Sequence, residues 1–557
     1  MAAATPAPQE KKNKREGLSP STIRIGKRYR ANRLQGPYDA VVVGSGIGGL
    51  TAAALLSQAG KKVLVLEQHY TAGGYTHSYD RNGYEWDVGV HYIGDMGTNT
   101  LARKVMDRIS GNRLQWAPME ACYDRGFFGD ETFDFVAGKS ALIAQLEQRF
   151  PEERDAIHRY MALLSKIGGA MQFVTLEKLL PPGVNRWVKP ASDKVFPPEL
   201  NQTTYEVLRS LTSNEKLIGV LATQWGDYGL PPKESSFLIH ALVARHYLYG
   251  GYYPVGGASQ IAATIIPEIQ ASGGEVFTYA RVKEILIENN RAVGVRMEDG
   301  TDIHAPIVIS GAGVLNTFER LVSRHVAIAN GYDQLLRQVK PSYGHLGMYI
   351  GLQEDAASLG LPGTNFWVYP DYDHDKNVAA FFKDSSQPFP VVYISFPSAK
   401  DPTFSERYPG RATIEIVAPV PYAEFAPWAD KMWGKRGDDY EALKEAYAQR
   451  MLAVLYDKVP QVRGKIDYYE VSTPLSTHYF CEYRYGELYG LNHDPQRFAQ
   501  SWLQVQTKIN GLYLTGQDVL SCGVVGAMMA GVVTAIKVLG LRGAKLGYEL
   551  FGPGGKP

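Results

Sequence analysis

The residues with the clearest chemical meaning form a glycine-rich turn near the start of the chain. Gly44, Gly46 and Gly49 follow the strand-like run 38–43 and have the spacing of a turn that binds a dinucleotide. In such a turn the first glycine permits a tight bend, the second lets the backbone approach a pyrophosphate, and the third lets a helix pack closely on a strand. Backbone N–H groups at the start of that helix would bind the phosphates. Three further residues complete the predicted binding turn: Ser45, Ile47 and Gly48.

An acidic residue follows at the distance expected of a ribose ligand. Glu67 comes after the apolar stretch 63–66 and lies 23 positions beyond Gly44, close to the separation of about 20 in dinucleotide-binding folds. A carboxylate there accepts hydrogen bonds from the hydroxyl groups of an adenosine ribose. Gly73 and Gly74 would let further backbone amides come close to the ligand. The order of these features predicts a nucleotide site rather than a merely structural glycine-rich turn.

A second anchor far along the chain indicates which dinucleotide binds. Gly516 and Asp518 follow the strand-like run 512–515, and a helix is expected to begin near Gly523 and to include Gly526. The acid at the strand end can hold a polyol hydroxyl group, and the start of the helix offers N–H groups to a negatively charged ring edge. A nicotinamide needs no second anchor, whereas the extended flavin of FAD does. We therefore expect FAD.

Two longer patterns describe elements around this site. The eighteen residues 519–536 carry no charge, and this length could cross a membrane. Because the run contains three glycines, follows a strand and lacks aromatic and basic flanks, we expect a buried helix whose glycines admit another backbone or a planar ligand. Alternating apolar and polar residues over 282–309, interrupted by turn residues, predict an antiparallel meander that ends in a buried strand.

The composition is that of a globular protein with more than one domain. The chain has 557 residues, of which 45% are hydrophobic and 21% charged. Its net charge of +1 provides no global basic field, so we expect no nucleic-acid partner. The three cysteines are too few and too scattered for a disulfide framework or a zinc site. We therefore expect a reducing compartment and no metal.

The fold class expected from these patterns is α/β. A Rossmann-type FAD-binding domain, with a mixed parallel sheet and an antiparallel meander, would be combined with a discontinuous α+β substrate domain. The predicted boundaries are a flexible basic tail at 1–35, an FAD-binding domain at 36–135, 250–320 and 500–545, a substrate and membrane-facing domain at 136–249 and 321–499, and a tail at 546–557.

The motifs described above resemble those of the flavin amine oxidase and phytoene desaturase superfamily, and the likeness extends over about 38–540. Within it, the chain resembles the retinol saturase family and its carotenoid isomerase relatives. Tyr75 stands where amine oxidases and carotene desaturases usually carry arginine, which weakens a desaturase assignment. The narrower likeness is carried by 67–69, 85–94, 246–254, 486–490 and 514–526. The FAD contacts that the resemblance implies are Glu67, Gln68, Gly73, Gly74, Asp518 and Val282, the last through its backbone at the adenine.

Saturation of a conjugated double bond at a flavin needs a hydride and a proton. No second complete glycine-rich strand, turn and helix with a following acid occurs in the sequence. We therefore expect an external electron donor or acceptor in place of a built-in NAD(P)H domain. A histidine, tyrosine or glutamate near the ring could supply the proton, although such residues more often serve packing. The candidate acids are His91, Tyr252, Tyr485, Tyr489 and Glu482.

The resemblance and an aromatic content of 11% imply an apolar polyene substrate, such as a retinoid, a carotenoid or a polyunsaturated fatty acid. The expected reaction is saturation of one double bond. An alternative on the same scaffold is cis/trans isomerisation or desaturation, which the mass of the product would distinguish. A more distant alternative is a prenyl-binding protein like the Rab escort and GDP-dissociation-inhibitor proteins. Those share this architecture, perform no redox chemistry and need not retain the terminal flavin anchor.

Polyenes of this kind lie in bilayers, so we expect a cytoplasmic protein that associates peripherally with a membrane. Aromatic and basic residues occur together at 167–194 and 425–436. This composition suits an interface and, equally, an ordinary amphipathic cap over the substrate domain. The basic first 33 residues contain no apolar core of a secretory signal. We therefore expect either a solvated tail or a segment that contacts anionic lipid headgroups.

Overall fold

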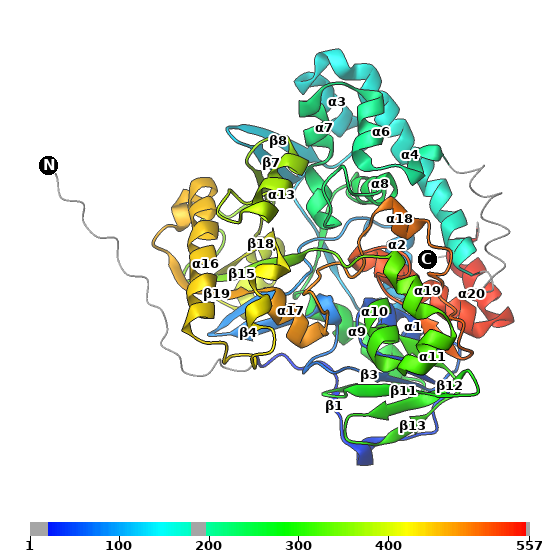
Figure 1. The fold of residues 1–557 in the computed structure, drawn as a ribbon. Coiled ribbons are helices and arrows are strands. Elements are labelled where there is room, and N and C mark those ends of the chain that lie inside the picture. The colour runs from blue at the N-terminus through cyan, green and yellow to red at the C-terminus, as the bar shows by residue number, and fades with distance from the viewer. Residues whose placement is uncertain (1–20, 180–196, 553–557) are drawn as a thin grey trace.

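The computed structural model describes residues 21–179 and 197–552 (Figure 1). Two large sheets carry the described part of the fold, one of six strands and one of seven. The predicted basic tail lies outside the described residues up to residue 20. The predicted membrane-facing segment 167–194 lies outside them from residue 180.

The six-stranded sheet confirms the predicted Rossmann-type core. Its strands are all parallel, whereas the sequence predicts a mixed sheet. Parallel strands are buried on both faces, which explains why the central strands are wholly aliphatic. In spatial order the strands are β1 (Lys27–Arg28), β10 (Glu275–Thr278), β3 (Val63–Leu66), β2 (Ala40–Val43), β14 (Val308–Ser310) and β20 (Leu512–Leu514).

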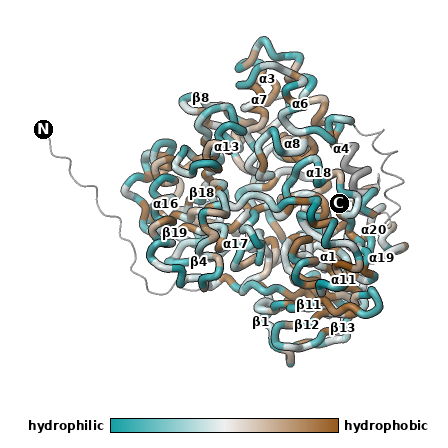
Figure 2. The backbone as a smooth tube through the Cα atoms, in the orientation of Figure 1, coloured by the Kyte–Doolittle hydropathy of each residue, from teal (hydrophilic) through white to brown (hydrophobic). Residues whose placement is uncertain are grey.

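The two faces of this sheet are covered by different layers. Val42 points to one face and packs with helices, whereas Val41 points to the other and packs with the meander. Hydrophobic segments gather in this part of the molecule (Figure 2). The covering helices are α1 (Ile47–Gln58), α2 (Leu101–Ser110), α9 (Ser259–Gln270), α19 (Gly523–Leu539) and α20 (Leu541–Phe551).

The meander is an antiparallel sheet, as predicted. It consists of β11 (Val282–Glu288), β12 (Arg291–Met297) and β13 (Asp302–His304). The chain then enters β14, all of whose residues are buried.

Helix α19 contains most of the uncharged run 519–536 and is buried against α1, as predicted. A Cβ atom on Gly531 would overlap the carbonyl oxygen of Gly48, so only glycine permits this close crossing of the two helices. None of the helices described in the structure is long and apolar enough to cross a membrane.

The seven-stranded sheet forms the core of the other half. β7 and β16 pair in parallel, and the other neighbours are antiparallel. Ile394 packs towards α16 (Asp438–Lys458) on one face, and Tyr393 packs into a helical cap on the other. In spatial order the strands are β19 (Ile466–Ser472), β15 (Gly344–Leu352), β18 (Ala412–Val420), β17 (Val392–Ser395), β16 (Asn365–Tyr369), β7 (Cys122–Phe128) and β8 (Glu131–Val136).

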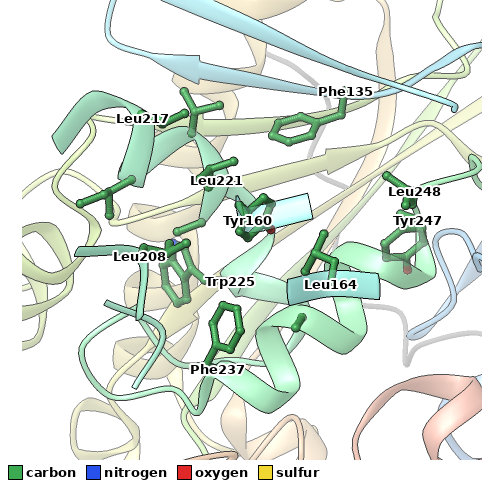
Figure 3. Packing of buried hydrophobic residues seen from close by; sticks show 14 of the residues in the cluster. Phe135, Tyr160, Leu164, Leu208, Leu217, Leu221, Trp225, Phe237, Tyr247 and Leu248 are labelled. Carbon is green, nitrogen blue, oxygen red and sulfur yellow. The ribbon is translucent and has the colours of Figure 1, made fainter. Parts of the chain in front are cut away.

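The helical cap follows β8 in the chain. Thr203, Asn214 and Ser236 begin three of its helices, and each side chain accepts a hydrogen bond from a backbone N–H of the first turn. Figure 3 shows Tyr160, Phe237 and other side chains of the resulting apolar cluster. The helices are α3 (Lys139–Arg149), α4 (Arg154–Lys178), α6 (Thr204–Leu211), α7 (Glu215–Leu221) and α8 (Phe237–His246).

Three predicted boundaries differ from the structure. Residues 27–28 form β1 because their backbone pairs with β10, so this part of the chain is not a flexible tail. Residue 135 falls inside β8, since β7 and β8 form a hairpin at the edge of the seven-stranded sheet. Residue 546 falls inside α20, where Leu546 and Leu550 are buried against the helical layer of the parallel sheet.

Candidate functional site

A large cavity is lined by residues of both sheets. Its volume is about 1690 Å³, whereas pockets for one small molecule usually have about 300–1,000 Å³. One part of its wall contains the glycine-rich turn and Glu67, and another contains aromatic side chains such as Trp367 and Tyr393. The cavity therefore has room for a dinucleotide and a second ligand.

The glycine-rich turn has the geometry that its spacing predicts. Gly44 has a φ of +94°, which favours glycine and bends the chain sharply after β2. A Cβ atom on Gly49 would overlap the carbonyl oxygen of Gly44 and lie 3.2 Å from Cγ1 of Val42, so the helix packs closely on the strand only without a side chain. A Cβ atom on Gly46 would meet no heavy atom within 4 Å among the described residues. This position leaves room for a ligand at the start of α1.

Ser45 lies behind this turn rather than in the cavity wall. Its backbone N–H and its hydroxyl group donate to Oε2 of Glu67, at 2.8 and 2.7 Å, and its Oγ accepts the N–H of Gly73 at 3.1 Å. The prediction that Ser45 contacts the cofactor is therefore not supported by its position, because its side chain is buried and fully used in holding Glu67.

The late anchor meets the early turn at the same cavity. Gly516 has a φ of +96°, and a Cβ atom there would meet no described heavy atom within 4 Å. Oδ2 of Asp518 accepts the N–H of Val314 at 2.8 Å, and Oδ1 accepts the N–H of Leu491 at 2.9 Å. Asp518 thus joins two loops in addition to lining the cavity. Gly526 lies outside the wall, because a Cβ atom on it would overlap Ser521 beneath the start of α19.

These residues fit an extended dinucleotide. Two helices, α1 and α19, begin at the cavity wall and direct their N–H groups towards it. The hydroxyl group of Thr515, also in the wall, is buried without a hydrogen-bond partner among the described residues. The predicted cofactor contacts that line the cavity are Gly44, Gly46, Ile47, Gly48, Gly49, Glu67, Gln68, Gly73, Gly74, Val282, Gly516 and Asp518.

Among the candidate acids, His91 lies in the cavity wall and pairs with a buried carboxyl group. Its Nδ1 is 2.8 Å from Oε2 of Glu415, and its carbonyl oxygen accepts a hydrogen bond from Nζ of Lys400 at 2.9 Å. Burial and the nearby Lys400 lower the pKa of His91 to about 3. Burial raises the pKa of Glu415 to about 8. At neutral pH the pair is therefore uncharged, and the carboxylic acid of Glu415 donates a hydrogen bond to Nδ1 of His91.

The other two candidates in the wall are already engaged. Tyr489 donates its hydroxyl hydrogen to the carbonyl oxygen of Gly226 at 3.0 Å. Glu482 ends α17 (Pro474–Cys481) and forms ion pairs with Arg320, at 2.5 Å, and with Arg281. Neither arrangement leaves an acid facing the second ligand.

Tyr252 and Tyr485 lie outside the cavity wall. Tyr252 is on β9 (Tyr252–Pro254), whose backbone pairs with β6 (Trp116–Pro118), and its own N–H and carbonyl group bond to Ile93. The side chain of Tyr485 is 38% exposed and packs edge-on against Tyr422. Their positions do not support the predicted roles as acids.

Comparison with known proteins agrees with this geometry. A family model described as an NAD(P)-binding Rossmann-like domain matches residues 42–109. The all-trans-retinol 13,14-reductase of Homo sapiens is 37% identical over 92% of this chain and 87% of its own length. The chain belongs to the all-trans-retinol 13,14-reductase family. This confirms the predicted resemblance.

Other relatives show how broad the likeness is. An inactive all-trans-retinol 13,14-reductase of Danio rerio is 30% identical over 92% of this chain and 88% of its own. A chloroplastic prolycopene isomerase of Daucus carota is 28% identical over 93% and 82%. Among solved structures, a putrescine oxidase has a TM-score of 0.59 at 16% identity, covering 90% of this chain and 99% of that one. The likeness to the putrescine oxidase structure confirms the predicted fold class.

This member of the retinol reductase family also has charged residues that no motif marks, of which Lys400 and Glu415 are buried and Asp227 is half-buried. Lys400 donates from Nζ to Oγ of Ser395 at 2.7 Å and to Oδ1 of Asn365, and burial lowers its pKa to about 7. Asp227 lies in the cavity wall, between Gly226 and Tyr228. Glu415 had a detectable signal, since it is the one charged residue in the otherwise apolar run of β18.

Proposed function

We propose that this chain is an FAD-dependent oxidoreductase that saturates one double bond of a conjugated apolar polyene, such as a retinoid. The observation that carries the proposal is the single cavity in which a dinucleotide cradle continues into an aromatic chamber. Membership of the all-trans-retinol 13,14-reductase family supports the choice of reaction. Carotenoids and polyunsaturated fatty acids belong to the same chemical class of substrate.

The two anchors support FAD as the dinucleotide. The turn at Gly46 and the start of α1 would hold the pyrophosphate, Glu67 the ribose and Val282 the adenine. Gly516, Asp518 and the start of α19 would hold the flavin half. When bound in its reduced form, FAD supplies a hydride to one carbon of a double bond.

The chamber beyond the cradle suits an apolar, planar ligand. Its wall is rich in rings and aliphatic side chains, including Trp225, Trp367, Tyr393, Val391 and Val417. Such a wall excludes water and binds a polyene by burial of apolar surface and by ring contacts. We expect electrons to come from an external donor that reaches the cavity mouth.

The rim of the cavity supports peripheral docking on a membrane from the cytoplasmic side. Trp433 and Tyr479 line the cavity and stack at 5.5 Å, and Met432 beside them is 67% exposed. Other parts of the predicted segment 425–436 serve packing, since Phe425 is fully buried. The three cysteines are unpaired, in keeping with a reducing compartment.

The decisive experiment is anaerobic incubation of the purified, lipid-supplemented protein with polyenes and a chemical reductant. The proposal predicts a yellow protein with a flavin spectrum and a product two hydrogens heavier than the substrate. A product of unchanged mass would indicate isomerisation, and one two hydrogens lighter would indicate desaturation. A colourless protein that takes up no FAD would contradict the proposal and favour a prenyl-binding protein.

A further inference from the structure

The hydroxyl group of Tyr92 lies between two carboxyl groups, that of the buried Asp124 and that of the half-buried Asp227. Its Oη is 2.8 Å from Oδ2 of Asp124 and 3.0 Å from Oδ2 of Asp227. Tyr92 is 6% exposed, and Asp124 is completely buried. Of the two carboxyl groups, that of Asp227 reaches the cavity wall.

The hydrogens in this cluster show where an additional proton resides. Tyr92 has one hydroxyl hydrogen, so it can donate to one carboxylate and not to both. Asp124 also accepts from Nδ2 of Asn365 at 3.0 Å and from Nε2 of Gln224 at 2.8 Å. Burial raises the pKa of Asp124, and the three donors oppose this rise because they favour its anionic form. A hydrogen bond between Tyr92 and Asp227 then requires that Asp227 carries a proton and donates it to Oη of Tyr92.

The surroundings of Asp227 favour its neutral form. Burial and the negative charge of Asp124 raise the pKa of Asp227 well above its usual range. The nearby cation is Lys400, which is linked to Asp124 through Asn365 and whose Nζ lies 6.0 Å from the centroid of the Tyr92 ring. The other titratable groups that interact electrostatically with Asp227 are Tyr123, Tyr228, Tyr247, Tyr369, Tyr393, Tyr489 and Cys522. They are neutral in their usual protonation states.

We propose that Asp227 is the catalytic acid that protonates the polyene, with Tyr92 and Asp124 as positioning residues. This inference rests on the proposed saturation reaction. In that reaction the π bond breaks, one carbon receives the hydride that the reduced cofactor supplies, and the neighbouring carbon receives a proton from Oδ of Asp227. Asp227 keeps the electron pair of its O–H bond and becomes a carboxylate, which then accepts the hydrogen bond of Tyr92.

This assignment explains why the predicted acids in the wall are not the donor. His91 is uncharged and accepts a hydrogen bond from Glu415, and Tyr489 donates one to the carbonyl oxygen of Gly226. Asp227 differs from them because its proton is hydrogen-bonded to the phenol of Tyr92. After Asp227 has lost this proton, the hydroxyl group of Tyr92 can donate a hydrogen bond to the new carboxylate. Residues that position a carboxylic acid in an apolar chamber in this way keep it neutral and reactive.

The test compares Asp227→Asn with the wild type and with a matched control, Asp375→Asn. Asp375 is also a carboxyl group whose pKa burial raises, to about 6, but it lies outside the cavity wall and accepts the N–H of Lys233. The first readout is the infrared C=O stretch of carboxylic acids at neutral pH, which needs neither cofactor nor substrate. We expect Asp227→Asn to lose one such band and Asp375→Asn to retain it.

The second readout is single-turnover saturation by the FAD-loaded, reduced enzyme in deuterated water. We expect Asp227→Asn to bind FAD normally and to saturate the polyene at least ~100-fold more slowly, as for the loss of a general acid. The Asp375→Asn control should keep the wild-type rate and incorporate one solvent deuterium. The wild-type rate should fall as the pH rises through the pKa of Asp227, because only the protonated form donates.

Several results would overturn the proposal. These are an unchanged acid band in Asp227→Asn, or an unchanged rate of saturation. Should Asp227→Asn fail to fold, Tyr92→Phe replaces it, and the acid band must then shift because Asp227 loses its partner; an unshifted band contradicts the proposal. If the wild type saturates no polyene, the proposed function and the role as donor both fail. The infrared band then still reports whether Asp227 is protonated.

Discussion

Alanine substitutions at Gly49 and Gly46 separate the packing role of the glycine-rich turn from its ligand-binding role. At Gly49 the new methyl group would overlap the carbonyl oxygen of Gly44 and press on Val42, and both obstacles belong to the core of the parallel sheet. At Gly46 the methyl group would meet only the cavity, and φ there is −59°, which alanine adopts without strain. The two variants should therefore change the stability of the cofactor-free protein in opposite directions.

The magnitudes follow from these contacts. Overpacking of a core costs about 1–3 kcal/mol, and the upper half of that range applies at Gly49 because the overlapped carbonyl group cannot rotate away. The better helix propensity of alanine recovers up to ~1 kcal/mol, so we expect Gly49→Ala to lose about 2 kcal/mol. Gly46→Ala should gain about 0.4–1 kcal/mol, because alanine restricts the unfolded chain.

Denaturant unfolding of the cofactor-free proteins, followed by tryptophan fluorescence, measures the change in the free energy of unfolding. Titration with FAD measures the change in cofactor affinity. Gly46→Ala should bind FAD on the order of 10-fold to 100-fold more weakly, since its methyl group stands where the pyrophosphate approaches the backbone. A Gly46→Ala protein that binds FAD like the wild type would refute the assignment of this turn as the cradle. A Gly49→Ala protein of wild-type stability would refute the packing argument.

Three further variants, one of them a double substitution, test other parts of the site. Asp518→Asn replaces one of two acceptor oxygens by an N–H₂ group that faces a backbone N–H, so we expect a loss of about 1–3 kcal/mol in denaturant unfolding and faster release of FAD. Glu415 has a folded pKa of about 8, against about 4.3 in an unfolded chain, so folding takes up a proton between these values. The wild type should lose stability relative to Glu415→Gln as the pH rises from about 5 to about 8, and parallel pH profiles of the two would contradict the assignment. The double variant Met432→Ser with Trp433→Ser should float less with anionic liposomes and keep its flavin. Tyr548→Ser, which removes a ring that is 66% exposed on α20, serves as its control, and equal flotation of all three proteins would exclude the rim as the docking surface.

The nucleotide half could be predicted from the sequence because its signals are local. Strand, turn and helix follow each other within 38–59, and Gly49 packs against Gly44 and Val42, which lie only a few positions away. The exceptions are instructive. Ser45 and Gly526 belong to the right motifs, but their side-chain positions point into the protein rather than into the cavity. Membership of a motif does not by itself determine which residues touch the ligand.

The chamber could not be predicted in the same way, because its residues come from distant segments. In β9 the two tyrosines point to opposite sides of the strand, and neither lines the cavity: Tyr253 is 2% exposed and donates to Asp87, and Tyr252 lies on the other side. Tyr92 is separated from Asp124 by 32 positions and from Asp227 by 135. Only the arrangement of the seven-stranded sheet and the helical cap brings these groups together.

The chamber combines an apolar wall with several carboxyl groups, and the protonation states explain how both can exist together. An isolated buried carboxylate is strongly disfavoured, so each acid must be paired or neutral. Asp124 is paired with three neutral donors, and Glu415 is neutral and bonded to His91. Among the residues that the structure describes, the carboxyl group of Asp227 has a hydrogen-bond contact with Tyr92 and no ion pair, which leaves protonation as its means of compensation. The same condition that lets an apolar polyene bind beside it therefore makes Asp227 a proton donor.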